Sequence, residues 1–212
     1  MSEREKGGNS MILEGKQLGF SYRHKGSFPV LQDVTLSLRS GERVGLIAPS
    51  GRGKTTLCKL LAGYEQPDHG QVLLDGKPLS RHRGFCPVQM IWQHPELAID
   101  PLLQLKRTLQ EAGPVEESTL HALQINPAWL NRFPSELSGG ELQRFCIARV
   151  FQPGLRFLLC DEITAMLDQI TQAQIWDFLI AEAQKRDLGM LVVSHNHHLL
   201  QRLCTRIIDL SI

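Results

Sequence analysis

The positions of hydrophobic residues along the chain indicate strands of two kinds. Val34, Leu36 and Leu38 alternate with polar residues, as on an antiparallel strand with one buried face. A strand-like pattern also begins at Ile12, and Gln71–Leu74 predicts a further strand. Other runs are short and continuously apolar, as in strands that are covered on both faces: Val44–Ala48, Arg156–Cys160 and Met190–Val193.

Helical spacing separates these runs. In Lys54–Ala62 the leucines follow the helical period, and Gly63 is expected to end this helix. Asp168–Arg186 predicts a longer helix that Asp168 caps. The section from about 95 to 153 is helical in pattern and is interrupted by prolines. Strands that alternate with helices in this way predict a parallel α/β sheet.

Composition places the chain among ordinary globular proteins. Of its 212 residues, 42% are hydrophobic and 21% charged, and the net charge of +1 gives no general attraction to nucleic acid. No run of about 18 apolar residues occurs, so no membrane-spanning helix is expected, and the first ten residues do not resemble a secretory signal. The 5 cysteines form no C-x-x-C pair and the histidines lack zinc-site spacing, which predicts reduced thiols and no metal cluster.

A glycine-containing loop follows the first buried strand and precedes the first helix. Ala48-Pro49-Ser50-Gly51-Arg52-Gly53-Lys54-Thr55 matches G-x-x-x-x-G-K-[ST], except that Ala48 occupies the first glycine position. The backbone N–H groups of such a loop and of the following helix N-terminus form an anion site. Lys54 is expected at the β and γ phosphates, Thr55 on Mg²⁺ and Thr56 at the α phosphate. The expected phosphate-binding residues are Ser50, Gly51, Arg52, Gly53, Lys54, Thr55 and Thr56.

Two other buried strands end in polar residues. Asp161 and Glu162 follow one of them, and His195 follows the other. Ligands of open α/β sheets bind at the carboxyl ends of the strands, so these residues and the loop are expected at one site. Asp161 is expected to hold Mg²⁺ through water, and Glu162 to polarise an attacking water molecule.

The string Leu137-Ser138-Gly139-Gly140-Glu141-Leu142-Gln143-Arg144 is the most informative in the chain. It predicts a helix that begins at Ser138, and the free N–H groups and partial positive charge of such a helix end make a second anion site. Together with the phosphate loop, the string resembles the ATP-binding subunits of ABC transporters, and the resemblance covers about residues 12–210. It implies a contact with ATP held by the opposite subunit, made by Leu137, Ser138, Gly139, Gly140 and Glu141.

Further landmarks follow in the order in which the family has them, and their roles rest on the resemblance. Gln93 corresponds to the Q-loop glutamine, which senses the metal and the γ phosphate and precedes the contact with the membrane subunit. Asp168 corresponds to the D-loop aspartate at the dimer interface, and His195 to the switch histidine at the γ phosphate. Tyr22 matches the aromatic residue that stacks on adenine, with Phe20 as the alternative.

The resemblance thus gives two sets of candidate residues. The expected catalytic residues are Lys54, Gln93, Glu162 and His195. The expected metal ligands are Thr55, Gln93 and Asp161.

The chain departs from the family pattern at four positions. Ala48 replaces a glycine, Ile163 a proline, Met166 a small residue and His94 an acidic residue. None of these changes removes a phosphate, metal or base group. ATP hydrolysis is therefore expected, and the effect of the four residues on its rate is left open.

The fold implied by the resemblance is α/β. It has a P-loop NTPase (RecA-like) core, an antiparallel β subdomain and an inserted helical subdomain. We expect a mobile tail at 1–10 and an ATPase domain at 11–212, with its core formed by 11–93 and 154–212 and its helical subdomain by about 94–153.

The resemblance implies an ATPase that uses ATP and Mg²⁺ to power a membrane transporter by closure of a dimer. The run from Gln93 to Pro101 resembles the subfamily that imports dipeptides, oligopeptides or nickel. The expected partners are transmembrane permease subunits and a second ATPase, identical or similar, and no nucleic acid. The expected location is peripheral, on the cytoplasmic face of the inner or plasma membrane.

Two other functions are weighed against this one. A soluble ABC-type ATPase that acts on nucleic acid or ribosomes usually carries a second cassette, a long coiled coil or basic arms, none of which occurs here. A subunit that binds ATP without hydrolysing it is disfavoured because Lys54, Asp161, Glu162 and His195 are all present.

Overall fold

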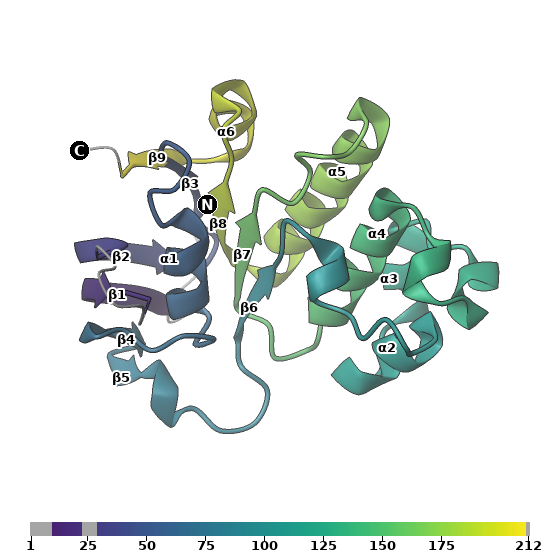
Figure 1. Ribbon diagram of the computed structural model, residues 1–212, viewed down its shortest axis with the longest axis horizontal. Coiled ribbons are helices and arrows are strands. Elements are labelled where there is room, and N and C mark those ends of the chain that lie inside the picture. The colour runs from purple at the N-terminus through teal and green to yellow at the C-terminus, as the bar shows by residue number, and fades with distance from the viewer. Residues whose placement is uncertain (1–9, 23–28, 211–212) are drawn as a thin grey trace, which may run out of the picture.

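The computed structural model describes residues 10–22 and 29–210. Residues 1–9 of the expected mobile tail lie outside the described part of the chain, so that prediction is not addressed. Two sheets form the body of the molecule, with a group of helices at one end (Figure 1). None of the helices in these ranges is long and apolar enough to cross a membrane.

The antiparallel sheet lies at the end of the molecule opposite the helices and has the strand order β2-β1-β4-β5 (Figure 1). Its first two strands pair with Leu13 opposite Leu38 and Leu18 opposite Val34, so the alternating leucines of both strands share one buried face. The strands are β1 (Ile12–Phe20), β2 (Leu31–Arg39), β4 (His69–Leu74) and β5 (Lys77–Pro78).

The central sheet is parallel, with the order β6-β7-β8-β3-β9. All residues of β7 and β8 are buried, which explains their continuously apolar sequences. The strands are β3 (Arg43–Ile47), β6 (Val88–Ile91), β7 (Phe157–Asp161), β8 (Gly189–Val193) and β9 (Arg206–Asp209). The prediction of a parallel α/β sheet is confirmed.

Helices cover both faces of the parallel sheet. One hydrophobic cluster joins α1 to both sheets, and a second joins α4 and α5 to the other face of the parallel sheet. The helices are α1 (Lys54–Leu61), α2 (Leu105–Ala112), α3 (Glu117–Ala122), α4 (Gly139–Val150), α5 (Gln169–Arg186) and α6 (His197–Leu203). Short 3₁₀ turns lie in the connections at Leu79–Arg81, Pro95–Leu97, Pro127–Asn131 and Pro134–Glu136.

The sequence pattern left four elements unpredicted: β5, β6, α6 and β9. The two strands of the parallel sheet among them, β6 and β9, have four residues each and lie at its two edges. Short edge strands carry little periodicity, so the pattern did not separate them from loops. The 5 cysteines are free thiols; Cys58, Cys146 and Cys160 are buried, while Cys86 and Cys204 are partly exposed.

Candidate functional site

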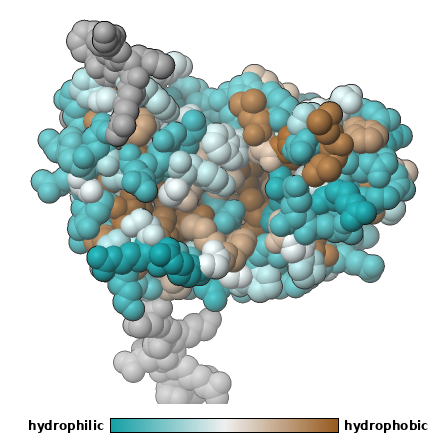
Figure 2. Space-filling model, turned by 60° about the horizontal axis from the view of Figure 1, so that its bottom comes forward, coloured by the Kyte–Doolittle hydropathy of each residue, from teal (hydrophilic) through white to brown (hydrophobic). Residues whose placement is uncertain are grey.

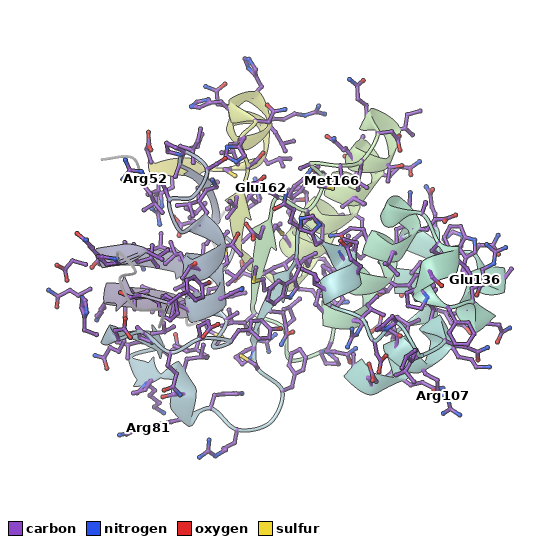
Figure 3. All side chains as sticks on the ribbon, in the orientation of Figure 1. Arg52, Arg81, Arg107, Glu136, Glu162 and Met166 are labelled. Carbon is purple, nitrogen blue, oxygen red and sulfur yellow. The ribbon has the colours of Figure 1, made fainter. Side chains whose placement is uncertain are left out.

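The carboxyl ends of β3, β7 and β8 bring the sequence-predicted residues together. Because β8 lies between β3 and β7, the loop after β3 and the residues after the other two strands share one edge of the sheet. His195 Nε2 lies 2.9 Å from Glu162 Oε1 and 3.4 Å from Lys54 Nζ. Figure 3 shows Arg52 and Glu162 at this edge. The three segments therefore meet as the strand pattern predicts.

The backbone between β3 and α1 is shaped by two glycines with left-handed φ angles. Gly51 has φ 78° and Gly53 has φ 79°, a conformation that L side chains rarely adopt. A Cβ atom on Gly53 would lie 2.8 Å from Leu31 Cδ2 and 3.0 Å from the Val30 carbonyl oxygen. Gly53 is also the N-cap of α1, and no side chain caps this helix end. The first N–H groups of α1 are thus left for a ligand.

Lys54 is buried, and its ammonium group is held by the loop itself. Its Nζ donates hydrogen bonds to the carbonyl oxygens of Ala48 at 2.9 Å and Pro49 at 3.1 Å. Glu162 Oε1 lies 3.8 Å away. The residue at the atypical first position of the loop therefore contributes a backbone carbonyl, which a glycine would also supply.

Asp161 is the buried carboxylate at the end of β7. Burial raises the pKa of its side chain, while a hydrogen bond with Thr55 and the positive charge of Lys54 act in the opposite direction. Its Oδ1 is buried and has no hydrogen-bond partner among the described residues. The Asp161 carboxylate thus has one buried oxygen that accepts no hydrogen bond from a described residue, and the Thr55 hydroxyl lies next to the same carboxylate. Oxygen ligands of this kind suit Mg²⁺.

Glu162 and His195 form the open side of the same site. Glu162 has φ 50°, and its backbone N–H donates to the Val193 carbonyl, which fixes the end of β7 against β8. A cavity of about 200 Å³ adjoins the pair and is also lined by Thr164, Gln172 and Asn196. A carboxylate and an imidazole at 2.9 Å, both close to Lys54 Nζ, can orient a water molecule between them and a phosphate.

The two candidate aromatic residues for adenine differ in exposure. Phe20 is 7% exposed and belongs to the core, whereas Tyr22 is 39% exposed and packs edge-on against the Phe20 ring. The Tyr22 hydroxyl lies 3.2 Å from the Thr56 hydroxyl, so the tyrosine leans over the start of α1. The geometry favours Tyr22.

Gln93 follows β6, is half-buried, and makes no hydrogen bond with a side chain of the described ranges. The preceding residue, Trp92, lines a hollow of about 460 Å³ whose walls are largely apolar, with Tyr64, Leu97 and Val150 among them, and which Glu111 and Arg149 also line. Figure 2 views this side of the molecule and shows apolar surface inside a depression between its two halves. Leu97, which lines this hollow, is 73% exposed, so an apolar side chain also projects there.

The second anion site begins at α4. Ser138 caps this helix by accepting from the Glu141 N–H at 3.3 Å, and the Glu141 carboxylate accepts from the Ser138 N–H at 2.7 Å. A Cβ atom added to Gly140 would touch Thr171 and Leu167, so this tip lies beside the start of α5. No described contact of residues 137–141 reaches Lys54 or Glu162.

Asp168 occupies the start of α5, next to the tip of α4. It accepts hydrogen bonds from the backbone N–H groups of Ile170 and Thr171, and from the Thr171 hydroxyl. These bonds, first of all the one from the Thr171 hydroxyl, lower the pKa of the Asp168 carboxyl. Asp168 is thus the helix cap that the sequence predicts, and its side chain is exposed.

The remaining atypical positions are placed as follows. Ile163 is buried in the core cluster of α4 and α5, so its side chain packs where the family has proline. Met166 is 72% exposed on the loop before α5, and Figure 3 shows it at the same side of the molecule as Glu162. His94 Nδ1 lies 3.1 Å from Glu96 Oε1 at the surface. None of the three obstructs the cradle around Lys54.

Sequence reasoning missed the roles of the two residues that end the α4 string, Gln143 and Arg144. Both are buried. Gln143 Nε2 donates to the Trp92 carbonyl, and Arg144 donates to the Leu123 carbonyl and to Gln174 Oε1 on α5. Their polarity inside an otherwise apolar helix face was the available signal, since buried polar groups need specific partners.

A family model described as ABC transporter matches residues 31–165. The chain belongs to the ABC transporter family. Its curated relatives include the nickel import ATP-binding protein NikE of Rhodospirillum rubrum, 36% identical over 200 residues that cover 86% of this chain and 72% of the relative. The NikE protein of Escherichia coli O157:H7 is 34% identical over 209 residues, covering 89% and 77%.

Solved structures agree with this placement. A dimeric bacterial ABC transporter cassette superposes with a TM-score of 0.82 at 23% identity, covering 94% of each chain, which establishes the common fold. An ATP-binding subunit of an ABC transporter superposes with a TM-score of 0.81 at 25% identity, covering 94% of this chain and 86% of the other. The chain is an ATP-hydrolysing subunit of an ABC transporter, and the alternative of an ATPase that acts on nucleic acid finds no support.

Proposed function

We propose that this ATPase powers the import of nickel, as the free ion or as a complex. The proposal is supported by two relatives named for nickel import that match at 36% and 34% identity across most of the chain. Peptide import, the other activity of the resembling subfamily, is the second candidate, because the run from Gln93 to Pro101 fits both substrates. The transported substrate itself contacts other subunits, so no residue of this chain is assigned to it.

In the proposed cycle the loop from Ser50 to Thr56 cradles the phosphates of ATP with its backbone N–H groups, and Tyr22 stacks on the adenine. Lys54 exchanges its two carbonyl partners for the phosphate oxygens, a stronger contact because donor and acceptor are then both charged. Thr55, Asp161 and Gln93 are the residues that would hold Mg²⁺, which would neutralise phosphate charge. The partnerless Oδ1 of Asp161 supports that assignment.

Glu162 is proposed to accept a hydrogen bond from the attacking water, and His195 to hold that water and the γ phosphate in line. The 2.9 Å contact between the two side chains keeps the Glu162 carboxylate turned into the site. Because the carboxylate is only slightly exposed, it meets little competition from bulk water. The chemistry of the step is positioning and electrostatic stabilisation.

Two chains are proposed to complete each site. The tip of α4, at residues 137–141, has no described contact with the phosphate cradle of its own chain, and it lies beside the exposed Asp168. A second ATPase, identical or similar, would present this tip and Asp168 to the γ phosphate held by the first. Closure of the dimer on ATP, and reopening after hydrolysis, would then follow from the differential affinity of ATP for the closed state.

The hollow lined by Trp92, the residue before Gln93, is the proposed contact with transmembrane permease subunits, which would place the ATPase peripherally on the inner face of the membrane. Its exposed Leu97 and its aromatic walls suit an apolar segment.

We also propose that the expected division holds, with a core at 11–93 and 154–212 and a helical subdomain at about 94–153. The helices of that second range lie together at one end of the molecule (Figure 1).

The test combines transport with dimer formation. Deletion of the gene in its host should lower cellular nickel, measured by mass spectrometry, and the wild-type gene, but not Glu162→Gln, should restore it. Unchanged nickel with lost dipeptide uptake would favour the second candidate. Purified Glu162→Gln protein should bind Mg-ATP and elute from gel filtration as a dimer, whereas a persistent monomer would contradict the two-chain site.

A further inference from the structure

The loop that leads from β7 into α5 begins with Glu162, and the backbone of this residue is strained (Figure 1). Its φ of 50° is in the left-handed region, which a residue with a side chain occupies only where its surroundings hold it there. On the side of the sheet, its N–H donates to the Val193 carbonyl at 3.1 Å. The direction of the Glu162 carboxylate therefore also depends on what holds the loop after it.

Two side chains of α5, one helical turn apart, hold that loop. Trp176 Nε1 donates to Thr164 Oγ1 at 3.1 Å, and Gln172 Nε2 donates to the Leu167 carbonyl at 2.9 Å. Residues four apart share a helix face, so both donors point at the loop from the same side of α5. The bond from Trp176 is the buried one, and its acceptor lies two residues after Glu162.

The bond at Thr164 acts on Glu162 through a single turn. The Ala165 N–H donates to the Glu162 carbonyl at 3.1 Å, which closes a turn around Ile163 and Thr164. The family pattern has a proline at position 163, and a proline ring fixes its own φ. Ile163 lacks that restraint, so the turn depends more on the side chains around it. Its Thr164 hydroxyl is held by Trp176.

Packing alone does not fix the loop against α5. The cavity of about 200 Å³ beside the site is lined by Glu162 and Thr164 on the loop and by Trp176 on the helix. Atoms that border a cavity lack the contacts that would otherwise hold them in place. A directional hydrogen bond supplies what packing leaves out there. A leucine at position 176 could fill core space, but it could not donate to the threonine.

We propose that Trp176 is a positioning residue for ATP hydrolysis, because its indole N–H holds Thr164 and thereby keeps the Glu162 carboxylate turned toward His195 and the attacking water. Trp176 itself is not assigned to ATP or to that water. The inference rests on the proposed role of Glu162 and names the residue that sets its position. Without the bond, the backbone of Glu162 can relax to a commoner conformation, while the cradle around Lys54 is unchanged.

The experiment uses the full-length protein and removes one partner of the bond at a time. Trp176→Phe removes the donor and Thr164→Val the acceptor, each at nearly constant volume. We expect kcat to fall about tenfold in both, because a small displacement of the group that meets the water is costly. Binding of a fluorescent ATP analogue should stay within about twofold of the wild type. Thr164→Ser keeps the hydroxyl group and should restore most of the activity.

Two matched variants control for the loss of an indole and of a buried hydroxyl. Trp129→Phe changes a tryptophan on the turn at Pro127–Asn131, away from the site. Thr108→Val removes a buried hydroxyl that has no hydrogen-bond partner in the described part of the chain. Both should keep the kcat of the wild type. If Trp176→Phe melts below the assay temperature, Thr164→Val is compared with Thr108→Val alone.

The Glu162→Gln background gives a readout that a merely structural role would not produce. The slow residual hydrolysis of Glu162→Gln is followed with labelled ATP, with and without Trp176→Phe. We expect no further loss, because the side chain that Trp176 positions has already been changed. A fall by the same factor in both backgrounds would show that Trp176 acts on something other than Glu162, and it would overturn the inference.

Hydrogen exchange measures the loop directly. In Trp176→Phe and in Thr164→Val, exchange of a peptide covering 162–168 should be faster than in the wild type, because its turn is held at one end only. A peptide covering β8 should exchange as before. Unchanged protection of 162–168 in both variants would contradict the proposed hold.

The outcomes separate the inference from the proposed function. Folded variants with the kcat of the wild type overturn the inference and leave the role of Glu162 standing. Control variants that lose as much activity also overturn it, because loss of core packing would then explain the effect. If Glu162→Gln hydrolyses ATP as fast as the wild type, the proposed role of Glu162 fails, and the inference fails with it.

Discussion

Two helix N-termini of this molecule are candidates for binding the same phosphate group, and they are built in different ways. α1 begins after Gly53, and no side chain caps it. α4 begins after Ser138, and a reciprocal capping box with Glu141 closes it. The first tip is surrounded by the cationic Lys54 and the carboxylate of Asp161, whereas the second carries a negative charge in its first turn.

This difference indicates which of the two helix N-termini binds phosphate by itself. At α1 the free N–H groups are maintained by the glycine backbone and no side-chain cap has to be displaced, so only the Lys54 ammonium group must leave its two carbonyl partners when phosphate binds. At α4 two donors are already satisfied by the chain itself, and the negative charge of Glu141 opposes an approaching anion. The α1 tip should therefore bind ATP alone, and the α4 tip should add to a nucleotide that is already bound.

The largest effect is expected from Lys54→Met, which removes the cation of the first tip and keeps its aliphatic stem. Turnover should fall about 100-fold or more, because a charged donor to the γ phosphate is lost in a partly buried site. A coupled assay of phosphate release measures this. Arg81→Met, exposed on the turn at Leu79–Arg81 and outside the phosphate loop, is the control and should retain most of the activity. Turnover in Lys54→Met equal to that of the control would refute the assignment of the cradle.

Asp161→Asn separates chemistry from stability at the same tip. Burial raises the pKa of this carboxyl above its value in an unfolded chain, so its charge destabilises the fold at neutral pH. The variant should lose Mg²⁺-dependent hydrolysis and yet unfold at a higher temperature at pH 7. This gain in Tm should shrink as the pH falls from the raised native pKa to the unfolded-state pKa, below which the carboxyl is protonated in both states. Calorimetry at several pH values measures it, and a Tm that falls at pH 7 would contradict the argument.

The first tip could be predicted from the sequence because its parts are local. A strand, a glycine loop and a helix follow one another directly, and their pattern placed Lys54 before the fold was known. The second tip could also be found as a helix start, since Ser138 and Glu141 have the S-x-x-E spacing of a capping box. Contacts such as Gln143 to Trp92 join residues 51 positions apart, and only tertiary packing brings them together.

Ser138→Arg tests the second tip, with a smaller expected effect on the fold than on assembly. The cap is lost, at a cost of about 1 kcal/mol in the free energy of unfolding, and a bulky side chain occupies the space where a second chain would approach. In the Glu162→Gln background, Mg-ATP should no longer give a dimer on gel filtration, while the monomer still binds ATP. Ser135→Arg, exposed on the preceding turn, is the matched control. Equal dimer formation by the two variants would remove this tip from the site.

The smallest effect, and the one that most sharpens the comparison, is expected from Glu141→Gln. A glutamine can still accept from the Ser138 N–H, so the capping box persists while the negative charge disappears. The dimer midpoint with Mg-ATP should improve up to about fivefold, the range expected for one exposed charge. Glu136→Gln, a carboxylate that caps the preceding turn through the Phe133 N–H, should change it little. The gain should also fade at high ionic strength, because salt screens an exposed charge. A weaker dimer in Glu141→Gln would mean that the carboxylate contributes to closure and that the two tips are more alike than their caps indicate.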